Sequence, residues 1–297
     1  MKLIKPYFNI IEQQAGLEGM YKQIEMAGRT CYKSEDKITE TSAKEFVDRM
    51  IKSGHGAMLE HGTVYLTIPN DSDLCLLLKM NPYTKCNPVE GICYITTNLR
   101  VLVEHKAMWL IDKYLCEPTE YHERRYTVKF ICDRGVSHEF VRHRVFSFAQ
   151  ESTRYCNYSK DKFGNEITCI LPPWLSENDL PKGFGYTSDD WGSLICEFYY
   201  EATEKGKSEG FTIEPVRNFV FALQTSEQLY FSLLKEGWKA QEARSVLPNA
   251  LKTELVMTGF ESDWKHFFFL RTPGSAHPQA RELAIPLKEE FINRKYI

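Results

Sequence analysis

Hydrophobic and polar residues repeat with two different periods along the chain, which predicts a mixture of helices and strands. Apolar or small residues recur at helical spacing from Gly16 to Arg29, and again after Ser42. Ser42 and Glu45 form the sequence of a capping box, and Gly54 stands where that helix would end. The same spacing predicts later helices in the ranges 138–145, 226–237, 263–271 and 279–283. Ser137 would be the cap of the first of these.

Strands are predicted where apolar and polar residues alternate, or where β-branched residues gather. These ranges are 3–11, 64–68, 128–132 and 251–258. Residues 93–104 fit either a strand that runs into a helix or one helix that begins near Thr97. Residues 157–190 contain several prolines and glycines with little periodicity, which predicts a long loop. No stretch of linker composition clearly divides the chain.

Composition narrows the class of protein. The 297 residues are 43% hydrophobic, enough for a substantial core in one large domain or two ordinary ones. A net charge of −3 argues against a general nucleic-acid binder. No apolar run is long enough to span a bilayer and the first residues do not resemble a secretion signal, so we expect an intracellular protein without a membrane partner. Nine scattered cysteines without a Cys-x-x-Cys pair favour reduced thiols.

The stretch from Arg142 to Tyr155 is the densest group of candidate binding residues. It combines three arginines, a histidine and a glutamine with Val145, Phe146 and Phe148. Arginines that are held by hydrophobic packing can bind phosphate oxygens through two-point hydrogen bonds. A surface cluster of ion pairs is the alternative explanation. Two further groups, Arg244 and the pair His266 with Arg271, offer the same chemistry elsewhere in the chain.

Other catalytic patterns are weak or missing. His55, Glu60 and His61 include metal-binding residue types, but the two histidines lack the spacing of a His-Glu-x-x-His site, so structural histidines are favoured and no metal is expected. The sequence has no Gly-x-Ser-x-Gly elbow and no cysteine in a Pro-Cys-His context. Cys156 follows Arg154 closely, yet a buried, unreactive thiol is the favoured interpretation.

The run Arg142-His143-Arg144, followed after seven residues by Ser152, resembles the signature of the flavin-dependent thymidylate synthases, and Arg154-Tyr155 extends the match. Three more segments resemble family segments in the same order. They are His55-x4-Glu60-His61, Ala243-Arg244-x-Val246-Leu247-Pro248 and His266-Phe267-x-x-Leu270-Arg271. The resemblance covers most of the chain apart from about 70–115 and 157–190, which are interpreted as insertions.

This resemblance implies an α+β fold, a twisted antiparallel sheet flanked by helices, in a single domain over residues 1–297 with two insertions. It implies a cytoplasmic homotetramer whose sites lie between subunits and contain FAD. The implied reaction is that of a methyltransferase of nucleotide biosynthesis: reductive methylation of dUMP to dTMP. Methylenetetrahydrofolate would donate the carbon, and flavin reduced by NADPH would donate the hydride. The absence of a cysteine nucleophile agrees with this family, in which no enzyme thiol activates the pyrimidine.

The resemblance also assigns residues by position. Those matched to dUMP are Glu139, Arg142, Gln150, Glu151, Ser152, Thr153, Arg154 and Arg244, with Ser152 and Arg154 at the phosphate. Those matched to FAD are Arg142, His143, Arg144, Gln150 and His266. Arg271 resembles the catalytic residue that stabilises the ionised N3 of uracil, a role suited to a permanently charged donor.

Three positions depart from the family pattern. Ala57 stands where a hydroxyl residue is usual, Phe260 where a polar residue is frequent, and Gln279 where glutamate is frequent.

Two alternatives to the flavin enzyme follow from other features. A catalytically inactive nucleotide- or phosphate-binding protein of the same fold is one, although Gln150 and Arg271 are intact. A cysteine-dependent thymidylate synthase is the other, and the missing Pro-Cys-His segment disfavours it.

Overall fold

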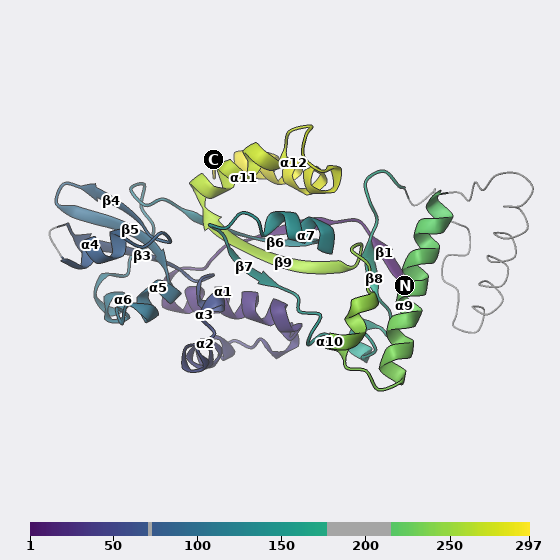
Figure 1. The fold of residues 1–297 in the computed structure, drawn as a ribbon. Coiled ribbons are helices and arrows are strands. Elements are labelled where there is room, and N and C mark those ends of the chain that lie inside the picture. The colour runs from purple at the N-terminus through teal and green to yellow at the C-terminus, as the bar shows by residue number, and fades with distance from the viewer. Residues whose placement is uncertain (71–72, 177–214) are drawn as a thin grey trace, which may run out of the picture. The chain divides into compact units, whose positions relative to one another are not determined.

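The computed structural model describes residues 1–70, 73–176 and 215–297. Its contacts divide the chain into two compact units (Figure 1). The larger unit consists of Pro6–Cys156 and Thr253–Ile297, and the smaller unit of Met1–Lys5 and Asn157–Lys252. This division does not test the expected single domain with two insertions, which stays a prediction. Part of the second expected insertion, residues 177–190, lies outside the described residues.

A four-stranded sheet forms the centre of the larger unit, with the strand order β2-β6-β9-β7. The strands are β2 (Tyr7–Ile11), β6 (Arg125–Asp133), β7 (Ser147–Gln150) and β9 (Lys252–Phe260). β2 pairs antiparallel with β6, and β7 pairs antiparallel with β9 so that Gln150 lies opposite Leu255. The mixed helix and strand content and the antiparallel pairing confirm the predicted α+β class.

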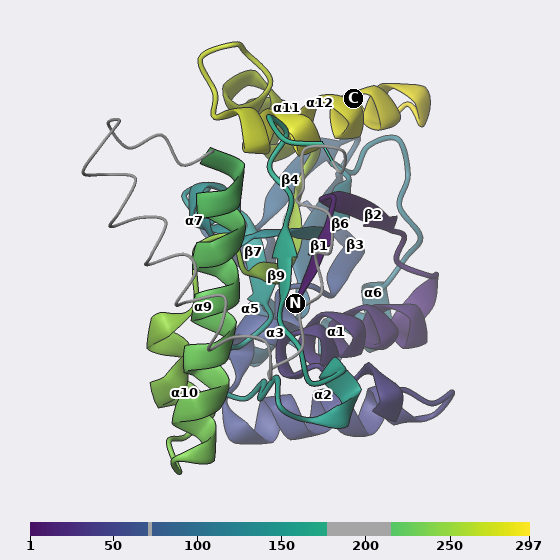
Figure 2. The same ribbon diagram turned by 90° about the vertical axis from the view of Figure 1, so that its right-hand side faces the viewer.

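Helices cover both faces of this sheet (Figures 1 and 2). One face carries α1 (Gly16–Tyr32), α2 (Ser42–Ser53) and α3 (Gly56–Leu59), and the other carries α7 (Arg134–Phe140), α11 (Glu261–Arg271) and α12 (Pro278–Asn293). Alternation along β6 explains this layering: Val128, Phe130 and Cys132 enter the core with α7, α11 and α12. Side chains that alternate with these three face α1, and one of them, Thr127, accepts a hydrogen bond from Gln23.

A second sheet, with the order β3-β5-β4, contains much of the first expected insertion. Its strands are β3 (Thr63–Pro69), β4 (Lys85–Val89) and β5 (Ile92–Asn98), and its neighbouring helices are α4 (Asp73–Lys79), α5 (Leu99–Glu104) and α6 (Trp109–Tyr114). Both strand pairs are antiparallel. β5 followed by α5 decides between the two predictions for residues 93–104 in favour of a strand that runs into a helix.

The smaller unit is built on a short parallel pair of strands, β1 (Lys2–Ile4) and β8 (Thr168–Ile170). The described helical elements of this unit are η2 (Asp161–Phe163), α9 (Pro215–Lys235), α10 (Ala240–Ala243) and η5 (Arg244–Val246). Tyr230 of α9 is fully buried and packs against Tyr158 at a ring distance of 5.9 Å. The predicted helix 226–237 is therefore the second half of α9.

Three local predictions are wrong. The expected strand 3–11 is broken into β1 and β2 around Pro6, which has no N–H to donate. Ser42 does not cap α2: it lies inside the helix, where its hydroxyl donates to Glu25. The expected helix 138–145 begins earlier and ends earlier, as α7. Gly54 does end α2, in the left-handed conformation with φ of 72°.

The cap of α7 is Asp133 and not Ser137. Asp133 Oδ1 accepts a hydrogen bond of 2.7 Å from Val136 N, and its Oδ2 accepts one of 2.7 Å from Gln279 Nε2 of α12. Ser137 lies one turn into the helix, where its hydroxyl donates to Arg134 O. A carboxylate at the helix start accepts from N–H groups that have no partner in the helix. Asp133 therefore fixes both the start of α7 and its contact with α12.

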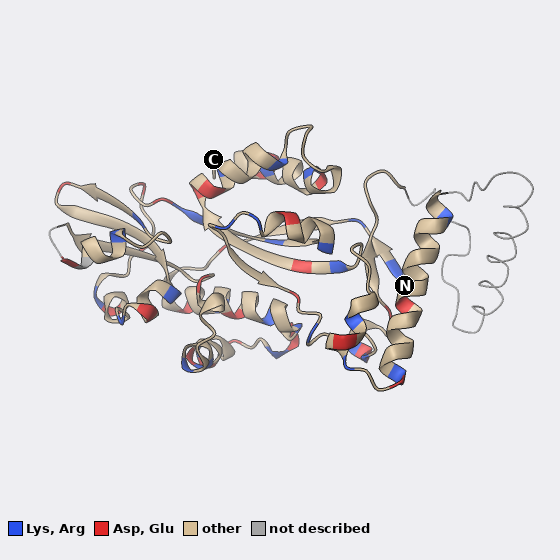
Figure 3. Cartoon of the chain, viewed as in Figure 1, with Lys and Arg blue, Asp and Glu red and all other residues tan. Residues whose placement is uncertain are grey.

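Charged residues of both signs are interspersed along the helices of the larger unit, and neither sign gathers along one helix (Figure 3). No helix in the described part of the chain is long and apolar enough to cross a membrane.

We predict that Asp133→Ala lowers the free energy of unfolding by about 1–2 kcal/mol, because the N-cap acceptor of α7 is lost. Urea denaturation measures the change. Asp133→Asn is the matched control, since its amide oxygen still accepts from the helix, and it should lose less. Equal losses in the two variants would show that the cap hydrogen bond does not stabilise this helix.

Candidate functional site

The predicted cations lie in the connection between α7 and β7. Phe140 and Phe146 are buried on either side and anchor this connection to the core. Between them, His143 is buried, whereas Arg142 and Arg144 are exposed. In the described part of the chain neither arginine has a hydrogen-bond or ion-pair partner. The mixture of apolar and charged residues is thus explained, except that Val145 is exposed and does not pack.

Arg271 joins α11 to this connection and to α7. Its Nε donates to His143 Nε2 at 3.0 Å, its Nη1 pairs with the Glu139 carboxylate, and its Nη2 donates to Glu139 O at 2.7 Å. All three nitrogens of the guanidinium are therefore bonded. The sequence predicted a role for each of these three residues, but not that they bind one another.

His143 is neutral in this arrangement. Burial, together with the charges of Arg271 and His266, lowers its pKa to about 4. Because Arg271 Nε donates to Nε2, that ring nitrogen carries no proton, and the neutral ring holds its proton on Nδ1. His143 therefore acts as a fixed acceptor that orients Arg271.

Gln150, the last residue of β7, lies on the same face of the sheet as α7. Its Nε2 donates to Ser137 Oγ at 2.9 Å and to Thr253 Oγ1 at 3.2 Å. Ser137 donates in turn to Arg134 O. With its amide nitrogen committed to these partners, Gln150 presents its carbonyl oxygen as an acceptor.

The loop after β7 divides into buried and accessible residues. Glu151 and Thr153 are buried, Ser152 is half-buried and Arg154 is exposed. Backbone contacts fix the loop: Glu151 N donates to Glu254 O at 2.8 Å, and Ser152 N donates to Cys31 O at 3.0 Å. The accessible side chains of this loop are therefore Ser152 and Arg154.

Aromatic packing supports Arg154. Its guanidinium lies 5.5 Å from the centre of the Tyr155 ring, and Tyr155 packs against Tyr32 at a ring distance of 5.3 Å. Arg154 N also donates to Ser152 Oγ at 3.4 Å. Ser152 and Arg154 consequently form one small group of donors at the end of the sheet.

The two remaining predicted residues are His266 and Arg244. His266 is exposed on α11, with its ring 6.2 Å from that of His143 and 6.5 Å from that of Phe269. Arg244 is exposed in η5, which belongs to the smaller unit. The larger unit therefore brings together Glu139, His143, His266, Arg271 and Gln150, next to the loop 151–154.

The three departures from the family pattern have structural consequences of different kinds. Ala57 is exposed in α3. Phe260 is buried at the end of β9, with the Arg125 guanidinium 5.4 Å from its ring centre. Gln279 holds the Asp133 carboxylate, as described for α7. Only Ala57 leaves a surface position without a polar side chain.

The histidine and glutamate types that can bind metals were considered above for His55, Glu60 and His61. Residues 1–70, 73–176 and 215–297 contain no group of three or more His, Cys, Asp or Glu side chains that could hold a metal ion. His61 is fully buried, its Nδ1 lies 2.8 Å from Thr258 Oγ1, and burial lowers its pKa to about 3. It is therefore a neutral hydrogen-bonding residue.

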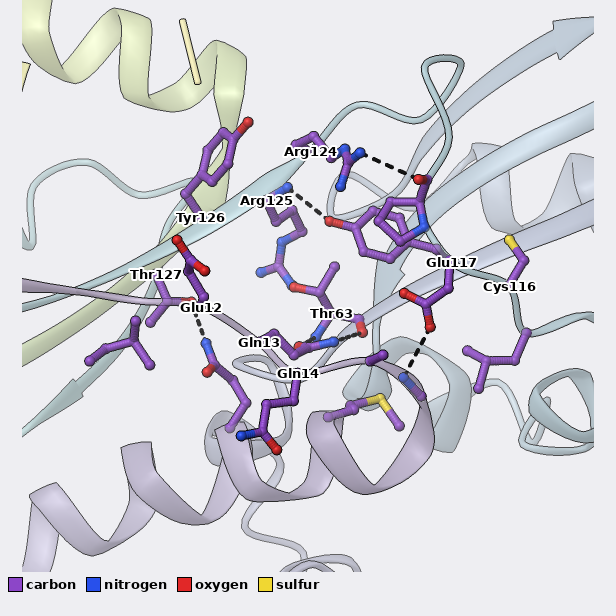
Figure 4. Close-up of a pocket in the computed structure, with 18 of the residues that line it drawn as sticks. Glu12, Gln13, Gln14, Thr63, Cys116, Glu117, Arg124, Arg125, Tyr126 and Thr127 are labelled. Carbon is purple, nitrogen blue, oxygen red and sulfur yellow. Dashed lines mark hydrogen bonds between the residues drawn. The ribbon is translucent and has the colours of Figure 1, made fainter. Parts of the chain in front are cut away.

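A polar pocket of about 390 Å³ lies at the other end of β6, where Arg125 begins the strand (Figure 4). Many of its polar groups bind one another. Gln13 exchanges two hydrogen bonds of 2.8 Å with the backbone of Thr63, and Glu117 accepts one of 3.2 Å from Gly16 N. None of the residues predicted to bind dUMP or FAD lines this pocket.

The sequence did not predict the residues that support the loop 151–154 on the α1 face of the sheet. These are Cys31 and Lys33 at the end of α1, Lys129 of β6 and Glu254 of β9. The predicted helix 16–29 stops just before the first two. Lys129 and Glu254 are oppositely charged residues in two predicted strands, which was a possible signal of pairing. The sequence does not show that these strands, β6 and β9, are neighbours in the sheet.

Comparison with known proteins gives distant relatives over nearly the whole chain. A flavin-dependent thymidylate synthase from Corynebacterium aurimucosum is 25% identical over 264 residues, which covers 88% of this chain and 72% of that protein. Another from Corynebacterium glutamicum is 23% identical over 278 residues, which covers 93% of this chain and 76% of that protein.

A solved structure of a UMP/dUMP methylase from Streptomyces cacaoi, bound with 5-Br dUMP, aligns with a TM-score of 0.42 and 16% sequence identity. The alignment covers 99% of this chain and 93% of that chain.

A family model described as thymidylate synthase complementing protein matches residues 118–294. This range takes in more than half of the 297 residues and contains every residue predicted to bind a ligand, from Glu139 to Arg271. The chain belongs to the thymidylate synthase complementing protein family, Thy1.

Proposed function

We propose that the protein is an FAD-dependent thymidylate synthase that converts dUMP to dTMP by reductive methylation. Methylenetetrahydrofolate would supply the carbon and NADPH the reducing equivalents. The observation that carries the proposal is the grouping of Glu139, His143, Arg271 and Gln150 around α7, beside the accessible pair Ser152 and Arg154. Family membership and the names of the relatives support it.

The nucleotide would bind along the end of β7. Ser152 and Arg154 offer a hydroxyl and a guanidinium to the dUMP phosphate, a charge-assisted combination. Gln150 offers its carbonyl oxygen as an acceptor at this end of β7. Glu139 lies in the last turn of α7, and Arg142 lies in the connection after it. Glu151 and Thr153 are buried, so they would support the loop and not touch the ligand. Arg244, on the smaller unit, would bind a nucleotide as part of an assembled homotetramer.

The flavin would bind at Arg142, His143, Arg144, Gln150 and His266. The exposed cations Arg142 and Arg144, which have no ion-pair partner in the part of the chain that the structure describes, fit the phosphates of an anionic cofactor. The exposed ring of His266 fits contact with a flat ring system. Bound FAD would supply the hydride that completes the methyl group. The proposal places these sites between subunits in the cytoplasm.

Arg271 would stabilise negative charge on the pyrimidine. A guanidinium stays protonated under working conditions, so it contributes charge and direction and not a proton. Its charge is balanced by Glu139, and His143 sets its orientation. When dUMP binds, an ionised N3 would replace the Glu139 carboxylate as the partner of Nη1.

The experiment that tests the function is reduction and turnover of the purified protein. FAD should give a yellow protein whose flavin absorbance falls when NADPH is added with dUMP, and dTMP should form once methylenetetrahydrofolate is present. Protein that cannot be loaded with FAD would contradict the proposal. Binding of dUMP without any dTMP would instead support the inactive nucleotide-binding alternative.

We predict that Arg271→Ala keeps its flavin and lowers kcat for dTMP formation by about 100-fold or more, because one preoriented donor to developing charge is lost. Steady-state kinetics measure this. Arg271→Lys should remain severely impaired, since a single ammonium lacks the planar fork of donors that binds Glu139 and His143 from different nitrogens. Near-normal turnover of either variant would reject the assigned role.

Arg154→Ala should weaken dUMP binding by about 2–3 kcal/mol, because a charged hydrogen bond to the phosphate is lost. Isothermal titration measures the affinity. Arg49→Ala is a matched control, because Arg49 is also exposed and lies 5.3 Å from a ring centre, that of Phe46. Unchanged affinity in Arg154→Ala, or an equal loss in the control, would count against Arg154 as a phosphate ligand.

A further inference from the structure

Two lysines and two glutamates form a compact charge cluster on the α1 face of the four-stranded sheet. Glu254 of β9 bonds Lys33 Nζ at 2.7 Å through Oε1, and its Oε2 pairs with Lys129 of β6. Glu35, in η1 (Glu35–Lys37), approaches Lys33 at 3.1 Å and Lys129 at 3.7 Å. The side chains of Glu254, Lys129 and Lys33 are only 11%, 19% and 21% exposed. We call these four residues the lysine–glutamate cluster.

The cluster depends on Glu254. Removing lysines from water is costly unless a carboxylate compensates their charge. Burial alone would lower the pKa of Lys33, but the charge and hydrogen bond of Glu254 raise it above its ordinary value. Lys129 also donates to Thr30 Oγ1 of α1 at 3.4 Å. Glu254 is therefore the anion that ties the end of α1 to β6 and β9.

Lys33 connects this cluster to the end of α1. It follows the helix in the left-handed conformation, with φ of 48°, and its N–H donates to Thr30 O at 3.3 Å. Two residues earlier, Cys31 O accepts the hydrogen bond from Ser152 N. Between them, Tyr32 packs against Tyr155. The last turn of α1 therefore touches the loop 151–155 with both backbone and side chain.

These contacts close a ring around the loop. The backbone oxygen of Glu254 holds Glu151 N, Ser152 N is held by Cys31 O, and Lys33 returns to the side chain of Glu254. One residue of β9 thus fixes the loop directly on one side and through the end of α1 on the other. A shift of Lys33 relative to β9 would move the backbone acceptor of Ser152.

We propose that Glu254 is a positioning residue for the nucleotide phosphate, acting through Lys33 and the last turn of α1 to set Ser152 and Arg154. This inference rests on the proposed function, because it takes dUMP as the ligand of that loop. Glu254 touches neither the nucleotide nor the flavin in this account. Its carboxylate is a negative group behind a site for a negative ligand, so simple electrostatics would have it oppose phosphate binding. On that ground alone, removing the carboxylate should strengthen phosphate binding. The positioning role predicts that removing it weakens phosphate binding.

The test is steady-state kinetics of Glu254→Gln, which keeps the side-chain size and removes the charge. The Michaelis constant for dUMP should rise about tenfold, the size expected for loss of one charged hydrogen bond, while kcat stays within about twofold and flavin content is unchanged. Glu12→Gln is the matched control, because it makes the same substitution at another ion-paired glutamate. Glu12 directly follows β2 and pairs with Arg294 at 2.9 Å. This control should leave both constants unchanged.

Two variants of Lys33 test the same contact from the other side. Lys33→Met should raise the Michaelis constant for dUMP as Glu254→Gln does, and it decides the matter if Glu254→Gln does not fold. Lys33→Arg retains a cation and should keep the constant within about threefold of the original protein. Because Glu254 and Lys33 act through one contact, combining Glu254→Gln with Lys33→Met should cost less than the two separate effects together.

An unchanged or lowered Michaelis constant in Glu254→Gln, with the original protein active, would overturn the positioning role. A fall in kcat at unchanged Michaelis constant would overturn it too, since that pattern places Glu254 in the chemical step. If the original protein forms no dTMP, it is the proposed function that fails. The two failures are therefore distinguishable.

Discussion

The guanidinium of Arg271 is the interaction on which the candidate site depends. It holds the carboxylate and backbone oxygen of Glu139 on α7 and the ring nitrogen of His143 in the following connection. A partly buried cation is stable only when its hydrogen-bond donors have acceptors, and these two residues provide them. His143 must stay neutral to accept, and its lowered pKa secures that state. Packing of α11 against the sheet thereby delivers a fixed charge to the end of α7.

Strand order explains why the remaining groups gather nearby. β6 and β7 end, and β9 begins, at the same end of the four-stranded sheet, so Asp133, Gln150 and Glu254 lie near one another although they are far apart in sequence. Side chains alternate between the two faces of a strand. Gln150 and Thr253 consequently bond Ser137 on the α7 face, whereas the neighbouring Glu254 forms the lysine–glutamate cluster on the α1 face. The loop 151–154 is supported from both faces.

The sequence predicted the class of fold and most residues of the group that the structure brings together, because those signals are local. Helical periodicity located α1 and α2, and the run from Arg142 to Arg154 carries its own signature. Local signals failed where a tertiary contact decided the outcome. Ser42 looked like a cap but bonds Glu25 of another helix, and the Asp133 carboxylate that caps α7 also accepts from Gln279 of α12. The pairing of Arg271 with Glu139 spans 132 residues and has no sequence pattern.

The most direct test of this account is a crystal structure of the protein with dUMP and FAD bound. The account predicts that the phosphate contacts Ser152 and Arg154, and that the Arg271 guanidinium has exchanged the Glu139 carboxylate for the uracil ring. A nucleotide bound in the polar pocket at the start of β6, or an Arg271 still paired with Glu139 and remote from the pyrimidine, would contradict it.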